Sequence, residues 1–279
     1  MQIKVGARTD LGRVRSNNED SFKLVPELNL FILSDGMGGE AHGEVASNLA
    51  VEAIAAHCLE GGQKPDLPYL VDPRAELNEK TNRLASAVQL ANKMIYESAQ
   101  KHAAQRGMGA TVVAIWINDQ RLSVAHVGDS RVYLLRSGEF QQITDDHSLV
   151  AEQVRRGILT KEQAESSDMQ SVLIRALGIE PEVQVDADEH LLMEGDILVL
   201  CSDGLSRMVS DLEIASTLLS RTGMQSTADR LIELANEYGG EDNVSVVLVR
   251  VEPRPEALLV RVWRWLNEPL QPTTSAGGN

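Results

Sequence analysis

Short apolar runs recur along this chain and predict the strands of a β-rich domain. The runs are dominated by Val, Ile and Leu, and in part they alternate apolar with polar positions, which is the two-residue period of a strand. Seven ranges show the pattern: residues 3–7, 29–34, 110–117, 121–127, 131–135, 196–202 and 244–251.

Helical spacing of apolar positions fills the gaps between these runs. It occurs over residues 43–59, 73–105, 211–219 and 226–237. Turn and breaker residues at 61–65 and Pro68 separate the first two helices. Ser226 is the N-cap expected for the last helix.

The order of these elements indicates the fold class. The strands within residues 110–135 are joined by connections too short for a crossover helix, so this part of the sheet is expected to be antiparallel. Strands and helices also come in separate runs rather than in alternation. The sequence therefore predicts an α+β fold.

One local repeat carries the first chemical signal. Two apolar strands end in the same tripeptide, Ser-Asp-Gly, which places Asp35 and Asp203 at the ends of buried strands. The glycine after each aspartate lets the backbone turn tightly beside a carboxylate that projects from a rigid edge. These two residues are candidates for a shared site.

Further acidic residues stand at matching places. Glu19 and Asp20 precede the strand-like run 21–25, Asp242 precedes the run 244–251, and Asp129 lies in the turn between two strands. Because strand ends and starts adjoin in an antiparallel sheet, these carboxylates are expected to meet on one edge. Such a cluster needs cations, and oxygen ligands favour Mg²⁺ or Mn²⁺, so the pattern predicts a two-metal carboxylate site.

Other interpretations of these residues compete with a metal site. An isolated Asp-Gly at a strand end is most often only a turn. His126 and His147 have no Ser or Cys near them in a recognised catalytic motif, and Ser34 and Ser202 precede the aspartates rather than occupy a nucleophile elbow. The combination of five acidic positions favours function.

Composition excludes some classes of function. The 279 residues include 26 Lys and Arg against 41 Asp and Glu, a net charge of −15, which disfavours nucleic acid as a partner. Cys58 and Cys201 are far apart and have no zinc-type spacing. Since no apolar run is long enough to span a bilayer and no leader pattern opens the chain, a soluble, cytoplasmic protein is expected.

Seven short segments, in order, resemble the motifs of the metal-dependent PPM/PP2C protein Ser/Thr phosphatases of the bacterial type. They are residues 15–20 (RSNNED), 35–39 (DGMGG), 43–47 (GEVAS), 127–131 (VGDSR), 146–148 (DHS), 202–205 (SDGL) and 242–245 (DNVS). The resemblance implies a four-layer αββα sandwich, in which two antiparallel sheets are flanked by helix pairs and hold a metal centre at one end. It assigns residues 1–252 to the phosphatase domain, with a flap over the site at about 141–182.

The resemblance also implies roles for individual residues. Asp35 would bridge two Mg²⁺ or Mn²⁺ ions, and the Gly36 carbonyl would hold the first ion. Asp203 and Asp242 would hold the second ion. Two further acidic residues, Glu19 and Asp20, would complete the cluster directly or through water.

The implied reaction is hydrolysis of phosphoserine or phosphothreonine by a metal-activated water. Arg15 matches the family's phosphate-binding arginine, so Asp35 and Arg15 are the expected catalytic residues. A guanidinium fork suits two phosphoryl oxygens better than a lysine does. The partners implied are proteins phosphorylated on Ser or Thr, among them a Ser/Thr kinase or its substrates.

Two departures from the family pattern affect these expectations. Bacterial relatives often carry His directly after the Gly-Gly of DGMGG, whereas this chain has Glu40 there and His42 two residues later, so the general acid stays open between His42 and water. Many relatives have an Asp four residues after Asp203 that helps hold a third ion with Asp129. Arg207 stands at that position, which leaves a third ion weak or absent.

Two other segments extend the picture. Asp168, in the expected flap, is a candidate for an extra metal ligand, but a solvated loop residue is the favoured interpretation. The flap is expected to be polar and irregular. Residues 253–279 predict an amphipathic helix and a flexible tail. That helix is expected to dock on the domain, with membrane or partner contact as the less favoured alternative.

Two functions remain open at this stage. The first is an active Mg²⁺- or Mn²⁺-dependent protein phosphatase, which intact Asp35, Asp203, Asp242 and Arg15 favour. The alternative is a catalytically weak metal-binding signalling module that recognises phosphorylated partners.

Overall fold

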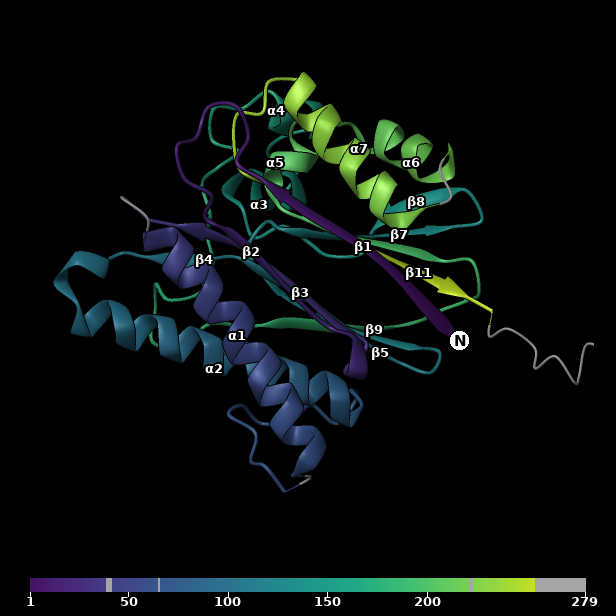
Figure 1. Ribbon diagram of the computed structural model, residues 1–279. Helices are drawn as coiled ribbons and strands as arrows, with labels where there is room; N and C mark the ends of the chain where they lie inside the picture. Colours follow the sequence, from purple (N-terminus) through teal and green to yellow (C-terminus); the bar gives the residue numbers. More distant parts are fainter. Residues whose placement is uncertain (39–41, 65, 221–222, 254–279) are drawn as a thin grey trace, which may run out of the picture.

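The computed structural model describes residues 1–38, 42–64, 66–220 and 223–253. Figure 1 shows two β-sheets packed face to face between two layers of helices. All strand pairs that the structure gives are antiparallel. The predicted α+β class and the four-layer αββα arrangement are therefore confirmed.

The first sheet brings the two ends of the described chain together. Its strand order is β1 (Gln2–Asp10), β11 (Val244–Glu252), β10 (Ile197–Cys201), β7 (Arg131–Arg136) and β8 (Glu139–Gln142). The second sheet has the order β2 (Asp20–Val25), β3 (Leu30–Met37), β5 (Val112–Asn118), β6 (Arg121–Val127) and β9 (Asp186–Leu191), and the short β4 (Gly109–Ala110) pairs with β3.

A pair of helices covers the outer face of each sheet. The helices α1 (His42–Gln63) and α2 (Glu79–Lys101) pack on the second sheet, and α6 (Asp211–Ser220) and α7 (Met224–Glu237) pack on the first (Figure 1). Three short helices lie in the connections: α3 (Leu149–Arg155), α4 (Lys161–Glu165) and α5 (Asp203–Ser206). Two 3₁₀ turns, η1 (Pro26–Leu28) and η2 (Ala103–Gln105), complete the described elements.

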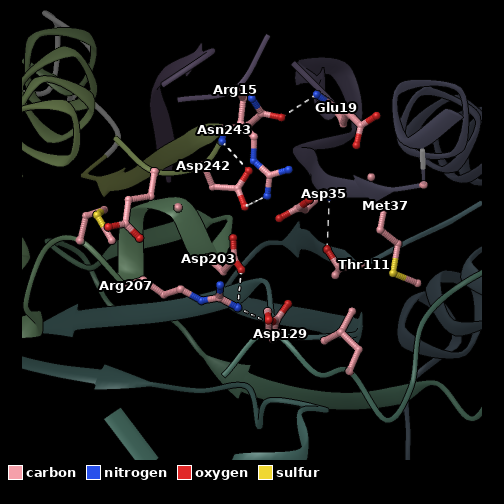
Figure 2. Close-up of a pocket in the computed structure, with 17 residues that line it drawn as sticks. Arg15, Glu19, Asp35, Met37, Thr111, Asp129, Asp203, Arg207, Asp242 and Asn243 are labelled. Carbon is pink, nitrogen blue, oxygen red and sulfur yellow. Dashed lines mark hydrogen bonds and ion pairs between the residues drawn. The ribbon is translucent and has the colours of Figure 1, made fainter. Parts of the chain in front are cut away.

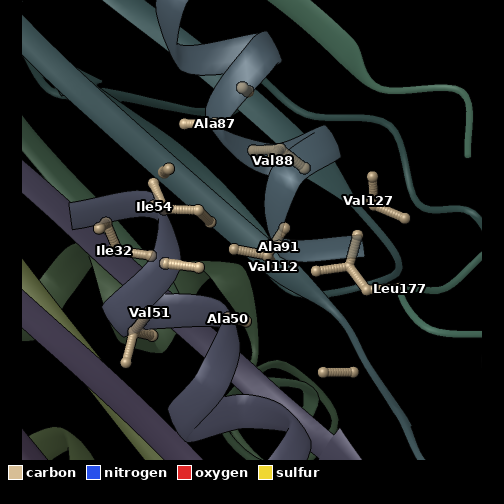
Figure 3. Close-up of a cluster of buried hydrophobic side chains, with 14 of the residues drawn as sticks. Ile32, Ala50, Val51, Ile54, Ala87, Val88, Ala91, Val112, Val127 and Leu177 are labelled. Carbon is tan, nitrogen blue, oxygen red and sulfur yellow. The ribbon is translucent and has the colours of Figure 1, made fainter. Parts of the chain in front are cut away.

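The central strands are apolar on both faces because each face meets another layer. On β3, Leu30 and Ile32 pack under α1 and α2, whereas Phe31 and Leu33 pack against the other sheet. Figure 3 shows Ile32 beside Ile54 of α1, in a cluster that also includes Val88 and Ala91 of α2. A strand buried on both faces has an almost continuous apolar sequence, which is why these strands alternate only in part.

The structure corrects some sequence-based boundaries. Strands β6 and β7 do not pair with each other: the chain crosses from one sheet to the other through residues 128–130. The expected N-cap Ser226 is wrong, because α7 begins at Met224 and Ser226 donates its hydroxyl hydrogen to the Gly223 carbonyl. Residues 141–182, expected to be a polar and irregular flap, are more regular than that, since they contain α3 and α4.

Besides α3 and α4, three elements were missed because their sequences carry little apolar signal. Strand β8 reads EFQQ and strand β9 reads DADEHL, and neither is buried along its length. Helix α5 is only one turn long. Backbone pairing with a neighbouring strand, rather than burial of side chains, defines β8 and β9.

Candidate active site

Acidic side chains from both sheets converge on one cavity at an end of the sandwich. Asp35 comes from β3, Asp203 from the start of α5, Asp242 from the segment before β11, and Asp129 from the crossover between the sheets (Figure 2). The cavity has a volume of about 400 Å³ and is also lined by Glu19, Gly36 and Arg15. The expectation of a single sheet edge is wrong, because the site spans the ends of both sheets.

Strand pairing positions Asp35. It lies directly opposite Asp20 in the register of β2 and β3. Thr111 holds its backbone from the other side: the Asp35 N–H donates to Thr111 Oγ1 at 3.2 Å, and the Thr111 N–H donates to the Asp35 carbonyl at 2.8 Å. These contacts fix the carboxylate at the cavity wall.

Gly36 allows α1 to start close against β3. A Cβ on Gly36 would overlap the Gly43 carbonyl, so no side chain fits at this position. The Gly36 N–H donates to the Glu19 carbonyl at 3.0 Å. The close approach keeps the backbone of Gly36 on the cavity wall, beside Asp35 and Glu19.

Asp20 lies behind the cavity rather than in its wall. It is buried, and Ser202 donates its hydroxyl hydrogen to Asp20 Oδ2 at 2.8 Å, while Oδ1 has no hydrogen-bond partner among the described residues. Burial raises the pKa of Asp20 to about 7, and the negative charges of Asp203 and Asp242 add to the rise. Ser202, dismissed as a nucleophile, is thus a support for this carboxylate.

Arg207 lies between two of the acids. Its Nη2 is 2.7 Å from Asp203 Oδ2 and 3.6 Å from Asp129 Oδ2. Burial raises the pKa of Asp203, and it raises the pKa of Asp129 to about 7; the positive charge of Arg207 opposes both shifts. The second oxygen of Asp203, Oδ1, is buried without a hydrogen-bond partner in the described part of the chain.

Arg15 and Glu19 enter the cavity from the loop before β2. Arg15 Nη2 is 2.7 Å from Asp242 Oδ2, and about half of the Arg15 side chain is exposed. The Asn243 side chain fixes this loop: it accepts a hydrogen bond from the Glu19 N–H at 2.8 Å and donates to the carbonyls of Leu11 and Asn17, both at 2.9 Å. The Asn243 side chain therefore connects the loop that carries Arg15 to the segment that carries Asp242.

The cavity is strongly acidic, and this suits a divalent cation. Burial raises the pKa of Asp35 well above its usual range, and the charges of Asp20, Asp203, Asp129 and Asp242 raise it further. Buried carboxylate oxygens without partners, on Asp20 and Asp203, are costly unless a cation or proton satisfies them. Since the donors are carboxylates and a backbone carbonyl, the residues present fit hard ions such as Mg²⁺ or Mn²⁺.

Most of the candidate residues from the sequence come together in the structure. Glu19, Asp35, Gly36, Asp129, Asp203, Asp242 and Arg15 line the cavity, and Asp20 stands directly behind it. Asp168 is exposed and does not line the cavity. His42 begins α1, and Glu40 and the segment 254–279 lie outside the described residues.

Sequence reasoning missed three supporting residues: Thr111, Ser202 and Asn243. Thr111 accepts a hydrogen bond from the Asp35 backbone, and Asn243 accepts one from the Glu19 backbone. Ser202 donates to the Asp20 carboxylate. The repeated Ser-Asp-Gly was the available signal for Ser202. Thr111, which lies between β4 and β5 and binds the Asp35 backbone, could not be found without the strand register.

Comparison with known proteins places this sandwich and its acidic cavity in a class of phosphatases. The family model described as protein phosphatase 2C matches residues 13–248, and the chain belongs to this family. Among its relatives is the serine/threonine phosphatase stp of Listeria welshimeri, which is 39% identical over 245 residues, covering 87% of this chain and 93% of the relative.

Solved structures agree with this assignment. The serine/threonine phosphatase PstP/Ppp of Mycobacterium tuberculosis has a TM-score of 0.79 and 39% identity, covering 90% of this chain and 99% of that one. A second structure, of the PstP catalytic domain in complex with two manganese ions, has a TM-score of 0.76 and 39% identity, again covering 90% and 99% of the two chains. None of the described helices is both long and apolar enough to cross a bilayer.

Proposed function

We propose that this protein is a protein serine/threonine phosphatase that hydrolyses phosphoserine and phosphothreonine with two bound Mg²⁺ or Mn²⁺ ions. The observation that carries the proposal is the convergence of carboxylates from both sheets on a cavity that also contains a half-exposed arginine. Membership of the protein phosphatase 2C family supports the same activity.

The residues that would hold the ions follow from their positions in the cavity. Asp35, at the centre of the acidic cluster, would contact both ions, with the Gly36 carbonyl and Glu19 on one side. Asp203 and Asp242 would hold the second ion, and Asp20 would support the cluster from behind. When bound, the ions would acidify a water molecule to serve as the nucleophile and would offset charge on the phosphoryl oxygens.

Arg15 would bind the substrate. Its guanidinium projects into the cavity opposite Asp35 and is oriented by Asp242 (Figure 2). A guanidinium can donate two parallel hydrogen bonds to phosphoryl oxygens, so Arg15 would both bind the phosphate and orient it for in-line attack. The phosphorus–oxygen bond to Ser or Thr breaks as the bond from the water oxygen forms, giving inorganic phosphate and a free hydroxyl group.

The proton for the leaving oxygen has two candidate sources. His42 stands at the start of α1, close to Gly38 in the cavity wall, and water is the alternative. A His42→Gln variant separates them, because a general acid at His42 predicts a loss of the alkaline limb in the pH profile of kcat.

The wider setting follows from the proposed activity. Residues 1–252 would form the phosphatase domain, with residues 141–182 as the flap, and the cytoplasm is the proposed location. The expected substrates are proteins phosphorylated by Ser/Thr kinases, including such a kinase itself. Comparing Ser/Thr phosphorylation before and after deletion of the gene would identify them.

A direct assay tests the proposed activity. Purified protein should release phosphate from phosphoserine and phosphothreonine peptides with Mn²⁺, lose this activity in EDTA and regain it when Mn²⁺ is restored. Phosphopeptide binding without turnover under any of these conditions would instead support the signalling module. The presence of Arg15, Asp35, Asp203 and Asp242 around one cavity favours the enzyme.

A further inference from the structure

A positive side chain of this chain already lies among the acids of the cavity. Arg207 Nη2 contacts Asp203 at 2.7 Å and Asp129 at 3.6 Å (Figure 2). The Asp203 and Asp129 side chains are only 13% and 10% exposed, so water screens these contacts weakly. The guanidinium therefore neutralises charge where a buried carboxylate is expensive to ionise.

Local structure places the three residues with little freedom. Asp203 is the first residue of α5 and Arg207 follows its last residue, so the two side chains lie on the same side of one helical turn. Asp129 follows Gly128, whose φ of +105° and close contact with Thr111 require glycine. The cation and both acids are thus fixed by the backbone.

The other nearby arginine has a smaller effect on Asp129. The charge of Arg131 also opposes the rise in the pKa of Asp129, but less than that of Arg207. The Arg131 guanidinium donates three hydrogen bonds to Asp146 and one to the Tyr133 hydroxyl. The carboxylate of Asp129 has Arg207 as its ion-pair partner. Neutralisation of Asp129 consequently depends mainly on Arg207.

We propose that Arg207 is a tethered cation for Asp129, so that the centre binds two divalent ions and no third ion beside Asp129. The inference rests on the proposed function, since it concerns the same metal centre. A third ion would have to displace the guanidinium from both acids and would meet its positive charge. The Arg207 guanidinium is part of the chain and does not have to bind from solution. It therefore occupies the position beside Asp129 at every metal concentration.

A second cluster in the structure is filled in the same way. Ligand atoms of His126, His147 and Asp186 lie within 4.8 Å of one another. Arg175 Nη1 lies 2.6 Å from Asp186 and 3.0 Å from His147 Nε2, so a guanidinium again occupies the space an ion would need.

The experiment measures the number of Mn²⁺ ions bound per chain and the melting temperature of the metal-free protein. Full-length wild type, Arg207→Gln, Arg207→Asp and Arg207→Lys are stripped with EDTA and titrated with Mn²⁺ up to millimolar concentrations by calorimetry and by dialysis with elemental analysis. Arg136→Gln is the matched control, because Arg136 pairs at 2.7 Å with the buried Asp196, away from the cavity.

Wild type, Arg207→Lys and Arg136→Gln should bind two Mn²⁺ per chain, whereas Arg207→Gln and Arg207→Asp should bind a third in the millimolar range. At mildly alkaline pH, metal-free Arg207→Gln should melt about 2–4 °C below wild type, and millimolar Mn²⁺ should remove the difference. For Arg136→Gln, any loss of melting temperature should persist in Mn²⁺.

Three ions on wild type, or two on Arg207→Gln with an unchanged metal-free melting temperature, would overturn the inference. A wild type that binds no Mn²⁺ would refute the proposed function instead. In that case the metal-free melting temperatures still decide whether Arg207 neutralises Asp129.

Discussion

His147 holds both backbone polar groups of Gly128. The His147 N–H donates to the Gly128 carbonyl at 2.9 Å, and the Gly128 N–H donates to His147 Nδ1 at 3.0 Å. Because Nδ1 accepts, the ring proton of the neutral imidazole is on Nε2, which faces Asp186 Oδ2 at 3.2 Å. A single buried histidine thereby fixes the turn that presents Asp129.

Replacing His147 should therefore loosen this turn. His147→Ala leaves the buried Gly128 N–H without an acceptor, which is expected to cost about 1–3 kcal/mol of unfolding free energy. His147→Asn, whose side-chain oxygen can accept, should recover part of the loss. Denaturant unfolding measures both; an alanine variant as stable as wild type would show that the histidine does not support the turn.

Asp35→Asn should abolish turnover without unfolding the protein. The change removes the carboxylate proposed to contact both ions, so kcat/KM should fall at least about 100-fold. Since burial and four neighbouring acids raise the pKa of Asp35, a neutral side chain should leave the metal-free protein at least as stable as wild type. Circular dichroism and phosphopeptide kinetics check these outcomes.

The matched control for this variant is Asp168→Asn, which changes an exposed aspartate outside the cavity and should have wild-type kinetics. Near-normal Mn²⁺-dependent turnover by folded Asp35→Asn would refute the proposed two-ion centre.

Arg15→Lys should raise KM more than it lowers kcat. Lysine keeps the charge but loses the guanidinium fork, so binding of substrate and transition state should weaken together. Arg13→Lys is the control, because Arg13 is exposed nearby but does not line the cavity. If KM for a phosphopeptide is the same in Arg15→Lys and wild type, Arg15 does not bind the phosphate.

The metal-free protein should lose stability as pH rises from about 4 to about 7. The folded pKa of Asp20 and of Asp129 is raised to about 7, above the value near 4 of an unfolded aspartate. Across this window the folded state binds more protons than the unfolded state, so the unfolding free energy falls as pH rises. Mn²⁺ should reverse the loss.

Melting curves of EDTA-treated protein across this pH range provide the measurement. Asp20→Asn removes one of the groups whose pKa is raised and should flatten the slope. A melting temperature that rises between pH 5 and 7 in the stripped protein, beyond the rise in Asp20→Asn, would contradict the expected sign.

The sequence predicted the elements whose burial is strong. Strand β6 was placed at its exact bounds, 121–127, because it is buried on both faces and ends at a glycine turn. Strand β9 was missed because its polar residues are held by backbone bonds to β6, which no local pattern records. Long-range pairing, rather than local propensity, defines such strands.

In the candidate site, too, local features could be predicted and long-range features could not. The repeated Ser-Asp-Gly located Asp35 and Asp203, since a strand end followed by glycine is a local feature. That the site spans two sheets could not be predicted, because strands 121–127 and 131–136 separate into different sheets across only three residues. The contact of Arg207 with Asp129 depends on that separation, so only the family resemblance, and no local pattern, indicated that the two residues are close.

The pairing of β1 with β11 has a consequence for synthesis of the protein. The loop that carries Arg15 and Glu19 follows β1, whereas Asp242 and Asn243 directly precede β11, the last described strand. A growing polypeptide on the ribosome therefore cannot complete the cavity until its final strand has emerged. The protein would become active only after β11 has been synthesised and paired with β1. Partly translated chains would therefore remove no phosphate from neighbouring proteins.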